Sequence, residues 1–190
     1  MKVLGISGSL RLNSHNTNLL RAAAALFAPD VDYELWDGLK AVPPYDEDDD
    51  GPAAPAAVAE LRSAIAGADA VLFATPEYNA SVPGQLKNAL DWVSRPLASN
   101  VLRNKPVAVV GASTGAFGAV WAQAELRKIL ATIGARVVDG EVAVGHAPTH
   151  FDEEGVLVDS VVREQLAEVA DELVAAVTTR EIAARQAVAA

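Results

Sequence analysis

Cysteine is absent from the 190 residues of the chain, which excludes disulfide bridges, thiolate metal centres, iron–sulfur clusters and a cysteine nucleophile. Histidine is scarce, and His15, His146 and His150 are the imidazole ligands that the sequence offers. Pro148 lies between His146 and His150, so these two side chains cannot share one face of a helix. We therefore expect no metal site.

Basic residues and long apolar runs are also in short supply. The chain has 15 Lys and Arg against 25 Asp and Glu, a formal net charge of −10 and a sequence pI near 4.7. Without excess positive charge to neutralise phosphates, neither nucleic acid nor an anionic membrane is expected as a partner. The apolar runs are too short to span a bilayer, and residues 1–6 have the pattern of a strand rather than of a signal peptide. We therefore expect a cytoplasmic protein.

The composition is that of a globular protein, with 51% hydrophobic and 21% charged residues. The length suits one domain, residues 1–190, that is large enough to bury a core. Strand-like and helix-like segments alternate, which favours an α/β fold. The expected strands are 2–7, 33–36, 70–74, 106–111, and 135–138 with 141–144; the expected helices are 18–28, 58–66, 85–94, 119–133 and 161–189.

Uninterrupted apolar runs at 70–74 and 106–111 are typical of central strands buried on both faces. Five such strands suit a flavodoxin-like, doubly wound five-stranded parallel sheet in the order 2-1-3-4-5, with its switch point between the first and third strands. The acidic run from Asp46 to Asp50 is expected to be a solvated loop, with a lid over the ligand crevice as the alternative.

The segment from Gly5 to Thr17 joins the first strand to the first helix. At such a junction free helix N–H groups and the positive end of the helix dipole favour a phosphate. The spacing Gly5-x-x-Gly8 fits neither the dinucleotide loop nor the mononucleotide P-loop. The remaining donors suit the free oxygens of one terminal phosphomonoester; they are Ser7, Ser9, Arg11, Asn13, Ser14, Asn16 and Thr17. The alternative is that Ser14 or Asn16 only caps the helix and Arg11 is a solvated charge.

Two further strand–loop–helix junctions follow. Residues 75–79 come after the strand at 70–74, and residues 113–118 come after the strand at 106–111. Because the carboxyl ends of parallel strands meet at one edge of a sheet, we expect the three loops to converge on one crevice.

The three loops resemble those of the NADPH-dependent FMN reductases, a flavodoxin-like family that includes chromate, quinone and azo-dye reductases. The resemblance is carried in order by Gly8-Ser9-Leu10-Arg11 with Ser14 and Asn16, by residues 75–79 with Pro83-Gly84, Lys87-Asn88 and Asp91-Trp92, and by Ser113-Thr114-Gly115 with Gly118. It implies that the first loop holds the FMN phosphate and that the other two lie against the isoalloxazine ring. The implied cofactor-binding residues are Ser9, Arg11, Ser14, Asn16, Thr17, Pro76, Glu77, Tyr78, Asn79, Ser113, Thr114, Gly115 and Gly118.

The resemblance implies an FMN-dependent NAD(P)H oxidoreductase that passes hydride from NADPH or NADH to FMN and on to flavin, a quinone or another small acceptor. The flavin carries the redox chemistry, so no catalytic side chain is expected. Pro76 would stiffen the second loop, and the backbone N–H groups of residues 77–79 would bond the flavin edge. Tyr78 would offer an aromatic face or pack against the loop, and the main chain of Glu77 should matter more than its side chain.

Two family features bear on cofactor choice and assembly. Many relatives carry Gly-Gly-x-Arg after the third loop, whereas here Gly118 is followed by Ala119-Val120-Trp121, so NADPH and NADH stay open as alternatives. The resemblance also implies a homodimer or homotetramer that pairs through the helices after the second and third loops. The interface candidates, with core packing as their alternative, are Leu86, Leu90, Trp92 and Val93.

A flavodoxin-type FMN-binding electron carrier, without a nicotinamide reaction of its own, is the alternative function. Leu10-Arg11 favours the enzyme, because flavodoxins normally have a Ser/Thr-rich phosphate loop that lacks this pair. A receiver-like phosphotransfer domain is excluded, because the first strand is followed by no acidic pair and the third strand does not end in Asp.

Overall fold

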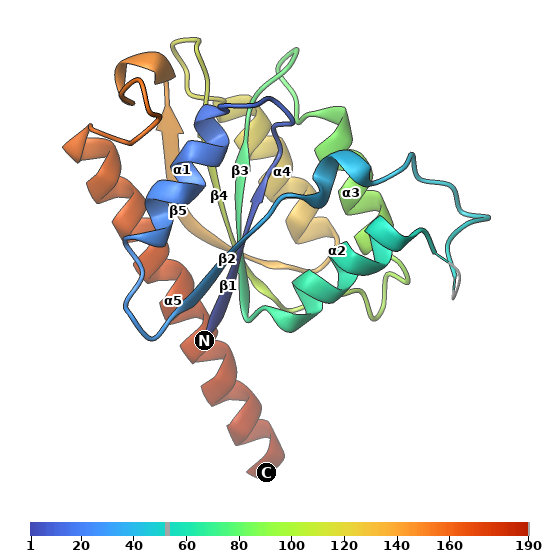
Figure 1. The fold of residues 1–190 in the computed structure, drawn as a ribbon. Helices are drawn as coiled ribbons and strands as arrows, with labels where there is room; N and C mark the ends of the chain where they lie inside the picture. The colour runs from blue at the N-terminus through green and yellow to red at the C-terminus, as the bar shows by residue number, and fades with distance from the viewer. Residues whose placement is uncertain (52–53, 190) are drawn as a thin grey trace.

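The computed structural model describes residues 1–51 and 54–189, and its centre is a five-stranded sheet in the order β2-β1-β3-β4-β5 (Figure 1). All neighbouring strands are parallel. The predicted strand order and fold class are therefore confirmed. The strands are β1 Lys2–Ser7, β2 Asp32–Trp36, β3 Ala70–Thr75, β4 Pro106–Ala112 and β5 Arg136–Val144.

Five α-helices connect or follow the strands in the described part of the chain. They are α1 His15–Ala24, α2 Ala56–Gly67, α3 Gly84–Val93, α4 Val120–Thr132 and α5 Ser160–Ala189. Two short 3₁₀ helices, Gly38–Ala41 and Ala147–Thr149, were not predicted. The first α-helix begins three residues before the predicted start at residue 18, because the Ser14 side chain caps it and accepts a hydrogen bond from the Thr17 N–H.

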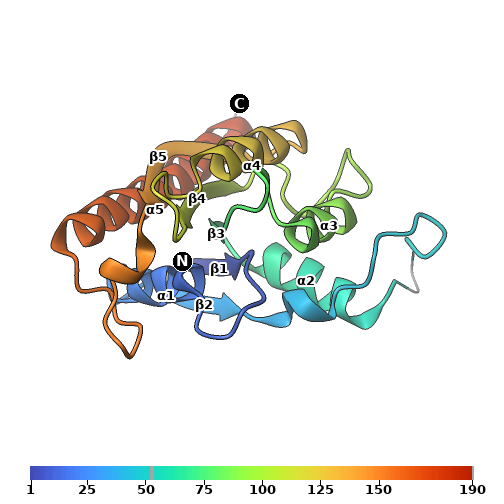
Figure 2. The same cartoon turned by 90° about the horizontal axis from the view of Figure 1, so that it is seen from above.

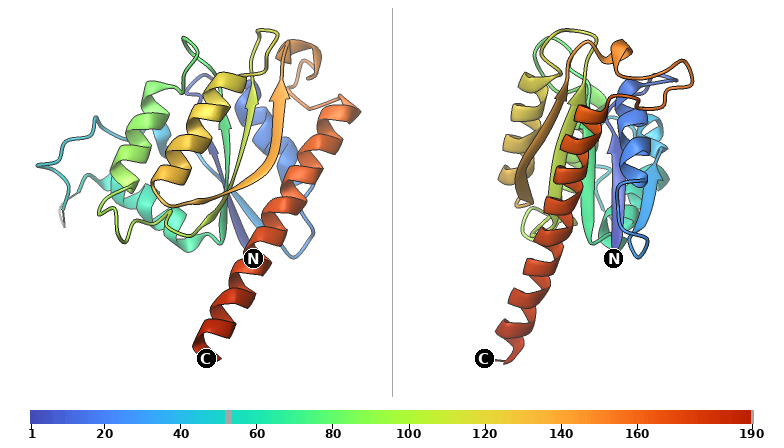
Figure 3. Two further views of the ribbon diagram at one scale, coloured as in Figure 1. Left: turned by 180° about the vertical axis from the view of Figure 1, so that it is seen from behind. Right: turned by 90° about the vertical axis from the view of Figure 1, so that its left-hand side faces the viewer.

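Helices cover both faces of the sheet, with α1 and α5 on one face and α2, α3 and α4 on the other (Figure 3). Every residue of β3 and β4 is buried, as the uninterrupted apolar runs predicted. Successive side chains of a strand alternate between the faces, so Phe73 packs under α2 and α3 while Leu72 packs under α1 and α5.

The apolar residues of α3 proposed as a subunit interface lie in the core instead. Leu86, Leu90, Trp92 and Val93 are each at most 2% exposed. The Trp92 indole N–H donates to the Pro43 carbonyl at 2.8 Å, and the Tyr45 ring meets the Trp92 ring edge-on at 5.0 Å. The segment after β2 therefore covers the helix face that we expected a second subunit to cover, and the interface assignment of these side chains is wrong.

Two cationic side chains, one buried and one half-buried, bind backbone carbonyl groups near the amino ends of β3 and β4, at the lower end of the sheet in Figure 1. The Lys105 ammonium, just before β4, donates to the Ile65 carbonyl at 2.7 Å and also to that of Ala68, so it caps the carboxyl end of α2. Burial lowers the pKa of Lys105. On α5, Arg180 donates to the Asp69 carbonyl at 3.1 Å.

Beyond Arg180 the helix α5 projects past the sheet (Figures 1 and 3). Over residues 160–187 the last fully buried side chain is Val177, and Ile182 is exposed. Across the residues that the structure describes, no helix is both long enough and apolar enough to cross a membrane. Within the acidic run, residues 46–49 are exposed as predicted, whereas Asp50 forms an ion pair with Arg62 at 2.8 Å.

Candidate FMN-binding crevice

Three loops meet at the carboxyl edge of the sheet, at the top of Figure 1. They follow β1, β3 and β4, and Figure 2 looks down on them from above. In the sheet, β1 lies between β2 and β3. The chain runs from β1 to β2 on one side of β1 and then crosses to β3 on the other side, so the switch point of the sheet lies at the carboxyl end of β1. The predicted convergence of the three loops is therefore present.

The first loop is held against the neighbouring strand. The Gly8 N–H donates to the Ala74 carbonyl at 2.8 Å, and the Thr17 hydroxyl donates to the Ser7 Oγ at 2.9 Å. The loop then turns through Asn13, whose φ is 55°, to reach the Ser14 cap of α1. The backbone N–H groups of residues 15 and 16 face no acceptor among the described residues, as is usual in the first turn of a helix.

Asn16 has a different role from the one expected of a phosphate ligand. Its Nδ2 donates to the Ala112 carbonyl at 2.9 Å, and its Oδ1 accepts from the Ala112 N–H at 2.9 Å. The side chain is 3% exposed and spans from α1 to the end of β4. It therefore locks the first loop to the third, and only its backbone N–H is left to meet a ligand.

Arg11 extends from the first loop and is exposed. Its guanidinium donates to the Asn13 carbonyl at 3.2 Å, which uses one of its five N–H donors. No carboxylate of the described chain lies within 4.0 Å of this guanidinium. Arg11 is thus a cation with unused donors at the mouth of the crevice.

The second loop is a tight turn that leaves Tyr78 in solvent. Tyr78 and Ser81 exchange two backbone hydrogen bonds of 3.1 Å, and Asn79 and Ala80 between them have φ of 53° and 58°. The Tyr78 N–H, one of the three that we expected to bond the flavin edge, is therefore paired within the turn. The Tyr78 side chain is 55% exposed and lines the crevice, so both alternatives, an aromatic face for a ligand and packing against the loop, stay open.

The side chain of Glu77 has a clear structural role, although we expected its main chain to matter more. One carboxylate oxygen accepts from the backbone N–H groups of Trp121 and Ala122, both at 3.0 Å. The N-cap residue of α4 is Ala119, which has no side-chain acceptor and a φ of 62°. Glu77 therefore caps α4 from a different loop, and its negative charge lies at the positive end of that helix.

The third loop is anchored to β5. The Ser113 N–H donates to the Val144 carbonyl at 2.9 Å, and the His146 N–H donates to the Gly115 carbonyl at 2.9 Å. Gly118 is buried with a φ of 59°, and a Cβ there would lie 2.3 Å from the Ala143 carbonyl carbon. This glycine is required for the approach of the loop to β5.

The loops enclose an open crevice of about 230 Å³. Its lining brings together most of the predicted site residues, namely Ser9, Arg11, Ser14, Asn16, Pro76, Glu77, Tyr78, Ser113 and Thr114, with Ala112 and His15. Four predicted residues lie outside this lining. Thr17 faces a hollow on the other side of the first loop, Asn79 is at the tip of its turn, and Gly115 and Gly118 shape the third loop.

His15 lines the crevice, although it was not among the predicted site residues. Its Nδ1 is buried without a hydrogen-bond partner in the described part of the chain, and its ring centre lies 5.3 Å from that of Phe151. Burial, followed by the charge of Arg11, lowers the pKa of the imidazole. Its place in the sequence could have pointed to the crevice, because His15 directly follows the Ser14 cap and is the first residue of α1.

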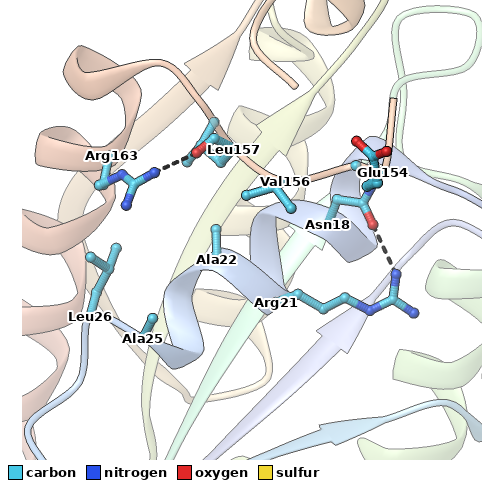
Figure 4. Close-up of a pocket in the computed structure, with 10 residues that line it drawn as sticks. Asn18, Arg21, Ala22, Ala25, Leu26, Glu154, Val156, Leu157 and Arg163 are labelled. Carbon is cyan, nitrogen blue, oxygen red and sulfur yellow. Dashed lines mark hydrogen bonds between the residues drawn. The ribbon is translucent and has the colours of Figure 1, made fainter. Parts of the chain in front are cut away.

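A second hollow, of about 320 Å³, lies away from the three loops (Figure 4). It runs between α1, residues 154–157 and the start of α5. Figure 4 shows Arg21 donating to Asn18 and Arg163 donating to the Leu157 carbonyl, with Ala22 on the wall. No Ser or Thr hydroxyl lines this groove, and its two arginines already donate to Asn18 and to the Leu157 carbonyl, so it offers a phosphate fewer free donors than the three-loop crevice.

The fold is that of a flavodoxin-like protein, and the crevice lies at the switch point of its sheet, where open α/β sheets bind their ligands. No cluster of three His, Cys, Asp or Glu side chains that could hold a metal occurs within residues 1–51 and 54–189.

Comparisons with known proteins agree with this class. A sequence model described as NADPH-dependent FMN reductase matches residues 1–149. The chain is 45% identical over 165 residues to an NAD(P)H-dependent FMN reductase of Pseudomonas aeruginosa, covering 86% of this chain and 88% of that protein. It is 36% identical to a 2-hydroxy-1,4-benzoquinone reductase of a Burkholderia species, covering 96% and 99%. Among solved structures, FerB, a flavoenzyme NAD(P)H:(acceptor) oxidoreductase from Paracoccus denitrificans, superposes with a TM-score of 0.84 at 33% identity, covering 94% and 98%.

The chain belongs to the NADPH-dependent FMN reductase family. It is accordingly an FMN-dependent NAD(P)H oxidoreductase, and the comparisons give no support to the alternative of a flavodoxin-type electron carrier.

Proposed function

We propose that residues 1–190 act as one domain that binds FMN in the three-loop crevice and uses NADPH or NADH to reduce quinones, free flavin or similar small acceptors. The observation that carries the proposal is the meeting of hydroxyl side chains, a helix N-terminus and an unpaired arginine at the switch point of the sheet. The names of relatives that reduce benzoquinone and FMN support the choice of acceptors.

The donor set fits a terminal phosphate. The free backbone N–H groups of residues 15 and 16 point along the axis of α1, and the Ser9 and Ser14 hydroxyls lie in the same lining. Arg11 adds a charge-assisted donor at the mouth. The buried Nδ1 of His15 has no hydrogen-bond partner among residues 1–51 and 54–189, and it offers a further polar contact there.

The remaining lining suits a flavin ring. Pro76 is buried and fixes the backbone of the second loop, while Ser113 and Thr114 form the opposite wall. We assign the backbone N–H groups of Glu77 and Asn79, but not that of Tyr78, to hydrogen bonds with the polar edge of the ring. FMN supplies reversible two-electron chemistry when bound, and the protein supplies binding, orientation and the exclusion of water from the inner face of the crevice.

We also propose that the chain works in the cytoplasm as a homodimer or homotetramer. With the apolar face of α3 buried in the monomer, the support for self-association comes from α5. Its last turns project beyond the sheet and carry the exposed Ile182. Isolated helical turns are marginal in water, so packing against a second copy would stabilise this projection.

The proposal is tested by FMN titration of the protein and of the Arg11→Ala variant. Loss of one charge-assisted contact to a phosphate should cost about 1.5–3 kcal/mol, which raises the Kd of FMN about tenfold to a hundredfold. Riboflavin lacks the phosphate, so its Kd should change little. Arg136→Ala, which removes another exposed arginine at the opposite end of the sheet, is the control. Equal weakening of FMN and riboflavin would remove Arg11 from the phosphate site.

A further inference from the structure

The exposed aromatic side chains gather at one edge of the protein. In the described chain, three aromatic side chains are largely exposed: Tyr78 at 55%, Phe117 at 64% and Trp121 at 49%. The other aromatic side chains are buried or half-buried. Tyr78 lies in the loop after β3, Phe117 in the loop after β4, and Trp121 in the first turn of α4, so all three border the carboxyl edge of the sheet.

Phe117 and Trp121 form a fixed pair. Their ring centres are 5.1 Å apart and their planes cross at 68°, an edge-to-face arrangement that aromatic pairs favour. The Glu77 carboxylate accepts the Trp121 N–H at 3.0 Å, so the backbone of Trp121 is tied to a residue that lines the crevice. Phe117 follows Thr114, which also lines the crevice, by three residues.

Exposed aromatic surface is unfavourable in water unless something covers it. Edge-to-face packing leaves a face of one ring of the pair open, and Tyr78 adds a further ring on the second loop. A ligand that presents its own planar ring to such a surface gains both area burial and aromatic contact. A compact inorganic ion gains neither.

We propose that Phe117 and Trp121 form one wall of the acceptor subsite and favour planar aromatic acceptors over compact ones. The inference rests on the proposed function, because it assigns the outer side of the same crevice. Tyr78 lines the crevice from the second loop, whereas Phe117 and Trp121 lie just outside that lining, in the segment that follows Thr114. A planar acceptor that extends outward from the flavin site would reach this pair. Aromatic residues in this role select acceptors by shape and polarisability rather than by hydrogen bonds.

Steady-state kinetics of the FMN-loaded protein tests the inference with two acceptors, menadione, which is a planar naphthoquinone, and ferricyanide, which is a compact anion. Trp121→Ala should raise the KM for menadione about three- to tenfold relative to the KM for ferricyanide, the size expected for one lost aromatic contact. Trp121→Phe, which keeps a ring, should restore most of the preference. Leu97→Ala removes an exposed apolar side chain from the loop between α3 and β4, at the opposite end of the sheet, and should leave both KM values unchanged.

The outcomes separate the inference from its rivals. Unchanged or equally changed KM values for the two acceptors would overturn it, and so would a rise confined to the KM for NADPH. Light scattering tests whether the aromatic pair is a subunit contact instead. If Trp121→Ala has a smaller assembly mass than the wild type but the same acceptor preference, the pair belongs to a subunit contact and the inference is overturned. If the wild-type protein oxidises NADPH with neither acceptor, the proposed function fails, whatever the variants do.

Discussion

Replacement of Glu77 by alanine should destabilise the protein through a helix that lies more than forty residues further along the chain. Glu77 accepts two backbone hydrogen bonds of 3.0 Å from the first turn of α4, whose own N-cap residue, Ala119, has no side-chain acceptor. Removing a cap of this kind costs about 0.5–2 kcal/mol, and loss of a negative charge at the helix N-terminus adds about 0.3–1 kcal/mol at an exposed site.

Because Glu77 is half-buried, we expect Glu77→Ala to lower the free energy of unfolding by about 1–2 kcal/mol. For a chain of this length, that corresponds to a fall in Tm of about 2–8 °C. Glu77→Gln keeps an acceptor oxygen and loses the charge, so its effect should be roughly half as large.

Chemical denaturation with and without saturating FMN measures this effect and separates it from any change in cofactor affinity. Glu60→Ala is a matched control, because Glu60 is an exposed helical carboxylate of α2 for which the described structure contains no hydrogen bond or ion pair. If Glu77→Ala and Glu60→Ala have the same stability, Glu77 does not cap α4 and the rigid placement of Trp121 has no support.

Further perturbations test other parts of the structure. Lys105→Ala leaves the end of α2 without its donor and should lower the free energy of unfolding by about 1–3 kcal/mol in denaturant titration; an effect no larger than that of exposed Lys128→Ala would contradict the capping role. Because the pKa of His15 is lowered in the folded protein, the unfolded chain binds a proton at a higher pH than the folded chain does. The free energy of unfolding without FMN should therefore decrease as the pH falls below 6.5, the ordinary pKa of histidine, and the decrease should be smaller in His15→Gln. Light scattering at micromolar concentration should give a dimer or tetramer mass, and a clean monomer would refute the proposed assembly.

Local patterns in the sequence were sufficient for the sheet. The apolar runs at 70–74 and 106–111 have no polar residue that could face water, so the burial of β3 and β4 on both faces followed directly. Ser14 could likewise be recognised as a possible cap, since a serine before an apolar helix is a local signal, and the structure confirms that bond. The convergence of the loops followed from the parallel arrangement alone.

Contacts between distant segments could not be read in the same way. Glu77 caps α4 across 44 residues, and Asn16 binds Ala112 across 96 residues, so neither pairing leaves a pattern in the sequence. Trp92 and its neighbours on α3 had the spacing of an apolar face, but the sequence does not state what covers a face. The segment that includes Pro43 and Tyr45 covers it here.

The central claim is that the three-loop crevice holds FMN and exposes it to a reduced nicotinamide. The most direct test is anaerobic addition of NADPH to protein that has been saturated with FMN and freed of unbound flavin by gel filtration. We predict that the visible flavin absorbance stays with the protein through the filtration and is then lost on addition of NADPH, in proportion to the bound FMN. Protein that emerges colourless, or that retains its flavin absorbance after NADPH is added, would contradict the account.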